Sequence, residues 1–540
     1  MSRGLGDVYK RQTSYGTLKA TKFIAHNANK RVSAEIKAIK KQNHSRFRSY
    51  AIEQASTAKA MGTGNNGVKY FPHSGSPKAL VILVEFSDTT FRSGEKAKNV
   101  FEHFLKGKAE DALPDGYEAY TGSYKNKNLL RNKGSVSDYF YDMSKGTYTP
   151  QFDVVGPYKL NHSSLYYGKG KKDNTDALVS DACKAADKDV DFSRYDADGD
   201  GMVDLVYIIY AGYPASMSGN PNDIWPKSGP GDGGFGTYDG KQVCRYGVHA
   251  ELNFGWAMNQ KNGFLLSGIG LFCHEFSHTL GLPDLYPTVD ASKVDNQNPE
   301  MWDLMDGGEY TFNGGYCPTP YSPWELDVMG WTSPVELGDE AKQVTLNSYY
   351  KERTAYKING ENDEYLLIQN IQKGGWWNGI ANVYNTGMLI WRIDYGTKDV
   401  NLFDNPNNNI SKPKVMIVPA DGYVISDYNH GDGKQWTDAQ YKASLQGDPF
   451  PGATKKTELL SVELNNSTLK KPFYNIKEAD GIITFDYLKD FATGIDSPVI
   501  QQNQEKDTRI FTLDGRYLGT DVSQLTKGVY IIGKKKVIIK

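Results

Sequence analysis

Residues His274 to Asp284 read HEFSHTLGLPD and are the most informative segment of the chain. On a helix, His274 and His278 are four residues apart and share one face, where both imidazoles can bind a single Zn²⁺. Glu275 lies beside that face, where it can take a proton from a metal-bound water and pass it to a leaving amine. Gly281 lets the backbone leave the helix in a left-handed conformation and return Asp284 to the metal. The pattern predicts the active site of a zinc peptidase.

Two alternatives compete with this interpretation. A bare HExxH pattern arises by chance, and buried histidines are often ordinary core residues. The apolar residues 270–273, together with Gly281 and Asp284, make chance a poor explanation. A second type of zinc site takes its third ligand from a later glutamate, and Glu300 lies 22 positions beyond His278. The sequence favours Asp284, because Gly281 supplies the turn that this residue needs.

A methionine turn is predicted downstream. Residues 301–308 read MWDLMDGG, and the glycine pair forces a tight turn after an apolar run. In zinc peptidases of the metzincin type, a methionine on such a turn forms a hydrophobic floor beneath the metal, and Met305 is the candidate here. The alternative is that Met305 is core filler.

These segments resemble the immune inhibitor A family of secreted bacterial zinc endopeptidases. The resemblance rests on HEFSHTLGLPDLY, on WDLMDGG and on SPWELDVMGW at residues 322–331, and it extends from about Leu80 to about Leu488. It implies a metzincin-like α/β zincin domain that acts on proteins or peptides. It also implies that zinc is bound by His274, His278 and Asp284 and that Glu275 is catalytic.

The sequence departs from the family pattern at two places. Ser277 stands where the family usually has glycine, and a small residue is thereby kept. Lys227, in the segment IWPK, stands where relatives commonly carry histidine.

A second metal site is predicted between the helix at residues 176–187 and the strand at residues 205–210. The segment DADGDGMVD from residue 196 places carboxylates at alternating positions around glycines, as an oxygen cage for a hard cation requires. Because a strand and not a helix follows it, a structural Ca²⁺ site is favoured over a sensor. An acidic turn without metal is the alternative. The predicted ligands are Asp196, Asp198, Asp200, the carbonyl of Met202, and Asp204.

Composition excludes several classes of protein. The 540 residues are too many for one core, and the net charge of −2 argues against nucleic acid as the main partner. No run of 18 apolar residues occurs, so no transmembrane segment is expected. The four cysteines lack CxxC spacing, which argues against a cysteine metal site. Cys273, next to a predicted zinc ligand, is expected to be buried and free.

The chain is expected to have four parts. Residues 1–72 form a propeptide-like segment, since residues 1–60 carry 13 Lys or Arg against 3 Asp or Glu and a Gly- and Asn-rich stretch follows. Residues 73–332 form the catalytic domain, with helices after Ser135 and at 176–187. Residues 333–490 alternate apolar runs with Gly- and Asn-rich turns, as in a β-sandwich. The loop GDPFPG at 447–452 is either a plain turn or a binding loop.

The last part, residues 491–540, predicts a linker and a small all-β domain. Its segments RIFTLDGR and KGVYII, and its lysine-rich end, resemble the C-terminal sorting domain of the type IX secretion system. That resemblance implies type IX secretion machinery as a partner and secretion to the medium or cell surface of a Gram-negative bacterium. No signal peptide is visible at residues 1–12, so the true start is expected to be missing.

The sequence as a whole predicts a secreted zinc endopeptidase, made as a zymogen, with Zn²⁺ and Ca²⁺ as cofactors. Zinc would polarise the scissile carbonyl and activate a water, and Glu275 would act as the general base. An alternative function, from a class other than enzymes, is that of a catalytically inactive surface adhesin on a peptidase scaffold. Intact histidines and glutamate argue against it, because an adhesin has no physical need for them.

Overall fold

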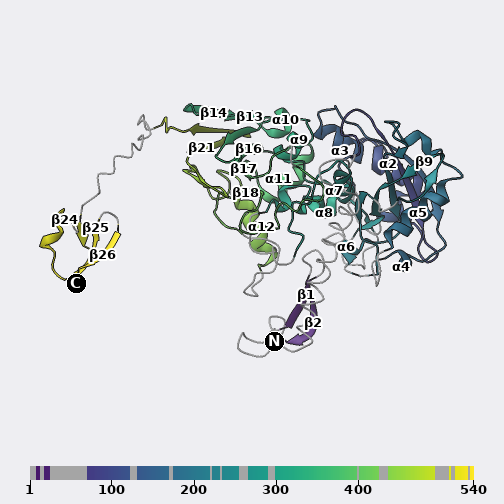
Figure 1. The fold of residues 1–540 in the computed structure, drawn as a ribbon, viewed down its shortest axis with the longest axis horizontal. Coiled ribbons are helices and arrows are strands. Elements are labelled where there is room, and N and C mark those ends of the chain that lie inside the picture. Colours follow the sequence, from purple (N-terminus) through teal and green to yellow (C-terminus); the bar gives the residue numbers. More distant parts are fainter. Residues whose placement is uncertain are drawn as a thin grey trace. The chain divides into compact units, whose positions relative to one another are not determined.

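The computed structural model divides the chain into two compact units, Met1–Leu488 and Lys489–Lys540 (Figure 1). The predicted linker around residues 494–505 and the small-residue stretch at 60–67 lie outside the described residues. The structure describes residues 8–12, 18–24, 70–121, 131–168, 174–218, 220, 222–230, 234–253, 265–289, 298–397, 400–424, 436–492, 510–512, 517–532 and 535–539.

A five-stranded sheet organises the region that carries the zinc motif. Four strands run parallel, and the edge strand β7 pairs antiparallel with β10. The central strands are buried on both faces, which explains their continuous apolar sequences. In sheet order the strands are β4 (Gln151–Lys159), β3 (Lys78–Glu85), β6 (Val206–Tyr210), β10 (Arg245–Ala250) and β7 (Lys227–Pro230).

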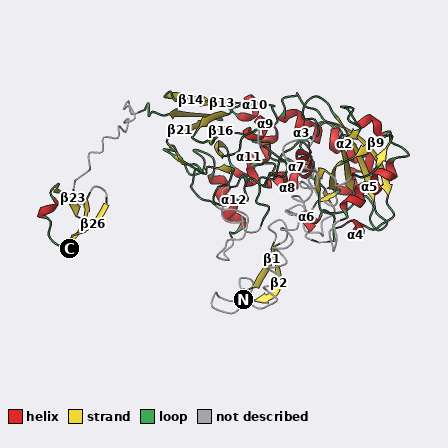
Figure 2. Cartoon of the chain, viewed as in Figure 1, coloured by secondary structure: helices red, strands yellow, loops and turns green. Residues whose placement is uncertain are grey.

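Helices cover both faces of this sheet (Figure 2). Alternate residues of β3 enter two different cores: Val81 belongs to the core with α2, α3 and α7, and Ile82 to the core with α5. Ser135 caps α3 through a capping box with Asp138, as predicted. The helix predicted at residues 176–187 is confirmed as α5. The helices are α2 (Ala97–Lys106), α3 (Val136–Met143), α5 (Thr175–Ala186) and α7 (Ile269–Thr279).

Two further sheets follow in the chain and share a core of their own. In β16, Leu366 and Ile368 face that core, whereas Tyr365 and Leu367 belong to the core that contains α7. The five-stranded sheet is therefore buried on both faces. Its strands are β13 (Val335–Glu336), β15 (Tyr356–Asn359), β16 (Tyr365–Ile371), β17 (Gly387–Ile393) and β18 (Val415–Ile417), and the second sheet holds β14 (Lys342–Leu346), β22 (Ile482–Tyr487) and β21 (Phe473–Ala479).

The zinc-motif region and these sheets lie in one compact unit, and the division at residues 332 and 333 stays a sequence-based prediction. Shorter elements complete the unit: α4 (Ser164–Tyr167), α6 (Ala215–Ser218), α8 (Thr311–Gly315), α9 (Pro323–Val328), α10 (Tyr349–Glu352), α11 (Asn378–Tyr384), α12 (Asp438–Gly447), β1 (Val8–Gln12), β2 (Leu18–Ile24), β5 (Met202–Val203), β8 (Thr237–Tyr238), β9 (Lys241–Val243), β11 (Leu252–Asn253), β12 (Leu265–Leu266), β19 (Val462–Glu463) and β20 (Thr468–Leu469). The β1–β2 hairpin was not predicted from the sequence.

The second unit contains one antiparallel sheet of four strands. They are β24 (Tyr517–Gly519), β23 (Ile510–Thr512), β25 (Gly528–Ile532) and β26 (Lys535–Ile539), in sheet order. Among the described residues of both units, no helix combines the length and the apolar character needed to cross a membrane.

Candidate zinc centre

Helix α7 carries the predicted zinc ligands through the middle of the fold. Every residue from Ile269 to Thr279 is buried. The Asn132 side chain accepts a hydrogen bond from the backbone N–H of Ile269 at 3.1 Å and so satisfies one free group of the first turn. Gly270 has no room for a side chain, because a Cβ atom there would lie 1.9 Å from the carbonyl oxygen of Glu309. The start of the helix is thus fixed by close backbone packing.

The chain turns at Gly281 as the sequence predicted. Gly281 has φ of 105°, which is strained for residues with a side chain, and a Cβ atom there would meet the Tyr70 ring at 3.0 Å. The turn brings Asp284 back against the helix. Its Oδ1 atom lies 3.2 Å from Nε2 of His274 and 3.1 Å from Nε2 of His278.

The structure therefore brings His274, His278 and Asp284 together, with ligand atoms within 4.8 Å of one another. Among the described residues, Glu300 does not belong to this group. Glu300 instead has φ of 49°, and its backbone N–H donates to Asp306 at 2.7 Å.

Backbone carbonyls fix the orientation of both imidazoles. His274 Nδ1 lies 2.9 Å from the carbonyl oxygen of Leu304, and His278 Nδ1 lies 2.7 Å from that of Leu282. A carbonyl can only accept, so each Nδ1 carries a proton, which leaves Nε2 of each ring as the atom that can bind a metal. Both Nε2 atoms face the buried Oδ1 atom of Asp284. Three electron-rich atoms that converge in this way fit a cation such as Zn²⁺.

In the metal-free protein a proton can take the place of that cation. Burial lowers the pKa of His274, but the carboxylates of Glu309 and Asp284 outweigh it and hold this pKa well above its usual range. At Asp284 burial acts in the other direction and raises the pKa of the carboxyl group. The two histidines outweigh burial and hold this pKa below its usual range. The site is built to hold positive charge.

Glu275 is buried beside the ligand group. Burial raises the pKa of its carboxyl group, and the neighbouring histidines oppose that rise. Ser228 on the edge strand β7 donates to the Glu275 carbonyl at 2.5 Å and lies 3.4 Å from Oε2 of the same residue. A carboxylate with a raised pKa next to a metal-bound water is suited to proton transfer near neutral pH.

Lys227, the departure in the IWPK segment, is the first residue of β7 and pairs with Val248 of β10. The structure thus places it on the same edge strand, immediately before Ser228.

The predicted methionine turn runs directly beside the site. Its Leu304 carbonyl accepts from His274, and the Met305 carbonyl accepts from the backbone N–H of Leu285 at 2.8 Å. Asp303 shapes the turn by accepting the Met305 N–H at 2.8 Å. Met305 is fully buried in the core that contains α7.

The segment SPWELDVMGW supports this turn from behind. Ser322 and Glu325 form a capping box at the start of α9. The Glu325 and Asp303 carboxyl groups are hydrogen-bonded to each other, and burial raises the pKa of both. The interaction of these two buried acids joins the segment to the methionine turn.

Ser277, the departure within the zinc motif, is accommodated by hydrogen bonds. Its hydroxyl donates to the Cys273 carbonyl at 2.6 Å and bonds the hydroxyl of Tyr321. The small residue is therefore used to tie α7 to the segment before α9. Cys273 itself is buried and free, as expected.

The GDPFPG loop contacts the same region. The Trp302 indole N–H donates to Oδ2 of Asp448 at 2.8 Å, and both side chains are buried. The loop thus anchors the segment that leads into the methionine turn, and its binding role stays a prediction.

The predicted calcium loop is only partly assembled. Asp196, Asp198 and Asp200 place carboxylate oxygens within 4.8 Å of one another. Asp204 lies outside that group, is buried, and accepts the Ala197 N–H at 3.0 Å. The Met202 N–H donates to Asp200 at 2.9 Å. The sequence did not reveal Lys241, whose Nζ lies 2.7 Å from Asp196 Oδ2.

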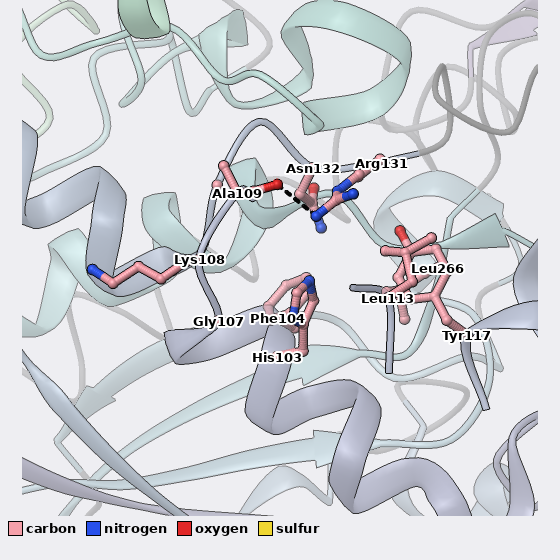
Figure 3. Close-up of a pocket in the computed structure, with 11 residues that line it drawn as sticks. His103, Phe104, Gly107, Lys108, Ala109, Leu113, Tyr117, Arg131, Asn132 and Leu266 are labelled. Atoms are coloured by element: carbon pink, nitrogen blue, oxygen red, sulfur yellow. Dashed lines mark hydrogen bonds between the residues drawn. The ribbon is translucent and has the colours of Figure 1, made fainter. Parts of the chain in front are cut away.

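A pocket lies near the start of α7 (Figure 3). Arg131 crosses it and donates to the carbonyls of Ala109 and Asp111, both at 2.5 Å. None of the zinc-site residues lines it. The lining residues are His103, Phe104, Gly107, Lys108, Ala109, Leu113, Tyr117, Arg131, Asn132, Gly134 and Leu266.

Comparisons with known proteins agree with this geometry. Residues 68–330 match the family model of the immune inhibitor A peptidase M6 catalytic domain. The chain is 27% identical over 308 residues to immune inhibitor A of Bacillus thuringiensis subsp. alesti, which covers 49% of this chain and 42% of the relative. It is 24% identical over 282 residues to the pre-pro-metalloprotease PrtV of Vibrio cholerae serotype O1, which covers 47% of this chain and 29% of that protein.

A protein of Arthroderma benhamiae that is named as a secreted metallopeptidase is 25% identical over 236 residues, with 39% of this chain and 34% of that protein covered. The chain thus spans less than half the length of each of these relatives. The matched segment holds the buried helix with its two histidines, the glutamate and the returning aspartate. Residues 68–330 are thus similar to the metallopeptidase catalytic domain of the immune inhibitor A (M6) type.

Proposed function

We propose that the chain is a secreted zinc endopeptidase that hydrolyses peptide bonds in extracellular proteins. The observation that carries this proposal is the convergence of His274, His278 and Asp284 next to buried Glu275. Bound Zn²⁺ would supply a Lewis acid and an activated water. The two histidines and Asp284 hold it, and Glu275 accepts the proton and returns it to the leaving amine. Met305 forms the floor of the site.

Metal-dependent proteolysis tests this function. Purified chain should hydrolyse casein, o-phenanthroline should abolish the hydrolysis, and added zinc should restore it, because the chemistry requires the metal. The adhesin alternative predicts no hydrolysis under any of these conditions. Retention of full activity in o-phenanthroline would contradict the zinc mechanism.

We also propose that Asp196, Asp198 and Asp200 bind a structural Ca²⁺, with the Met202 carbonyl and Asp204 completing the site. The three close carboxylates support it. The ion pair of Lys241 with Asp196 neutralises part of their charge, so calcium binds against this competing cation.

Calcium should stabilise the fold without entering the chemistry. A ligand that binds only the native state adds about 2.7 kcal/mol at a hundredfold excess over its Kd. EGTA should therefore lower the melting temperature, and the double variant D198A/D200A should lose this response. Lys241→Gln should enlarge the response, since it removes the competing cation. Identical melting curves of the wild type with Ca²⁺ and with EGTA would exclude the site.

The C-terminal unit is proposed to be a sorting domain read by type IX secretion machinery, and residues 1–72 a propeptide. The separate four-stranded sheet of residues 510–539 supports the first proposal, since an address domain needs no contact with the catalytic site. Deleting residues 501–540 should leave casein hydrolysis intact and retain the protein in the periplasm of the native host. Cell fractionation checks this, and export at the full-length level would contradict it.

A further inference from the structure

Glu309 lies behind one zinc ligand and belongs to none of the motifs that the sequence singled out. It is in the 3-10 helix Gly307–Tyr310, immediately after the methionine turn. Its side chain is 4% exposed, and its Oε2 atom lies 3.5 Å from Nδ1 of His274. This oxygen is buried without a hydrogen-bond donor among the described residues, although the carboxyl group as a whole also interacts with the side chain of Tyr310.

The position of Glu309 is set by the helix that carries the ligand. Its backbone carbonyl would lie 1.9 Å from a Cβ atom at Gly270 and 2.5 Å from one at Gly315. The backbone of Glu309 is therefore pressed against the first turn of α7, one turn before His274. Carboxylate and imidazole therefore come from two elements whose backbones are in close contact.

Two acceptors consequently lie near the Nδ1–H group of His274. The Leu304 carbonyl accepts it at 2.9 Å, and Oε2 of Glu309 lies 3.5 Å from the same nitrogen. A carboxylate behind a metal-binding imidazole fixes the ring and makes its free nitrogen a stronger donor to the metal. At His278, the Leu282 carbonyl has the corresponding place, and among the described residues no carboxylate forms an ion pair with Nδ1 of that ring.

We propose that Glu309 is a positioning residue that holds the His274 imidazole in its zinc-binding orientation and strengthens zinc binding. The proposal rests on zinc at the site described above. It also accounts for the buried Oε2 atom beside this ring, since a buried carboxylate oxygen without a donor destabilises a protein unless a nearby cation compensates it.

That cost gives the proposal a signature that a purely structural residue would not produce. Leucine has nearly the shape of glutamate but neither charge nor acceptor. In the metal-free protein, Glu309→Leu removes the cost of a buried carboxylate and also its attraction to His274, and because these two effects oppose each other the melting temperature should stay close to that of the wild type. In the presence of zinc, the same substitution removes the support of His274 and should weaken metal binding.

The experiment uses the full chain, stripped of metal and titrated with zinc against a chromophoric chelator. We expect E309L to bind zinc about 10- to 100-fold more weakly than the wild type. Glu309→Gln keeps the shape of the side chain and an acceptor oxygen but removes the charge, so it should also weaken zinc binding. It replaces E309L in the titration if the leucine variant does not fold. Glu251→Gln is the matched control. Glu251 is a buried carboxylate that accepts from Tyr120, Arg92 and Gly212 and contacts no zinc ligand, so its loss should leave zinc affinity unchanged.

Equal zinc affinity of the wild type and both Glu309 variants would overturn the proposal while leaving the zinc peptidase intact. A loss of affinity matched by an equal fall in the melting temperature of the metal-free variants would also overturn it, because the role would then be structural. A wild type that binds no zinc at all would refute the proposed function together with this inference.

Discussion

Replacing Glu275 with glutamine should lower peptide hydrolysis by at least about 10²-fold while zinc content and fold stay unchanged. Glutamine keeps the size and the polarity of the side chain but cannot take a proton from the metal-bound water. Glu275 is not one of the three grouped ligands, so the metal should remain bound. The measurement is the turnover of a peptide substrate by variant and wild type, each with its zinc content determined.

The melting curve of Glu275→Gln provides the control. The carboxyl group of Glu275 is buried with a raised pKa, so its neutral replacement should not destabilise the protein at neutral pH. Turnover near that of the wild type, in a variant that retains zinc, would refute the role of Glu275 as the base.

Replacing Asp284 with alanine should remove most of the bound zinc, whereas Glu300→Ala should leave it in place. Oδ1 of Asp284 lies 3.2 and 3.1 Å from the two Nε2 atoms, and no other described carboxylate joins the ligand group. Without this oxygen, two neutral imidazoles remain, which are too few ligands for a protein zinc site.

Metal analysis of the two variants after identical dialysis separates the two types of zinc site. Glu300 is the matched comparison, because it is also a buried carboxylate and comes after the Gly281 turn in the chain. Loss of zinc from Glu300→Ala with retention in Asp284→Ala would show that the third ligand is the later glutamate.

The local part of the site could be predicted from the sequence. The four-residue spacing of His274 and His278 fixes their common face on any helix, and Gly281 marks the turn because left-handed backbone favours glycine. Both features depend on residues close in the chain, and the structure reproduces them. The capping serine of α3 follows from equally local chemistry.

Contacts between distant segments could not be predicted. Glu309 approaches His274 only because the methionine turn folds against α7. Lys241 reaches Asp196 from strand β9, which is distant in the sequence. The acid pair of Asp303 and Glu325 likewise joins two motifs that the sequence shows only as neighbours in the chain. Nothing in the spacing of these residues encodes such contacts.

The sheet after the catalytic region shows why apolar patterns alone leave the packing open. Residues 365–371 are buried throughout β16, and alternation of polar and apolar residues is lost. Such a run does not reveal what covers each face. In the structure one face packs on the second sheet and the other joins the core that contains α7.

The central claim is that one zinc ion, held by His274, His278 and Asp284, performs the chemistry. Its most direct test is a zinc titration of the metal-stripped full chain, followed by peptide hydrolysis, with Asp284→Ala titrated in parallel. Wild-type activity should rise from nothing in proportion to zinc and level off at about one ion per chain, while Asp284→Ala should stay inactive at that level. Activity in the metal-stripped wild type, or an equal rise in Asp284→Ala, would contradict it.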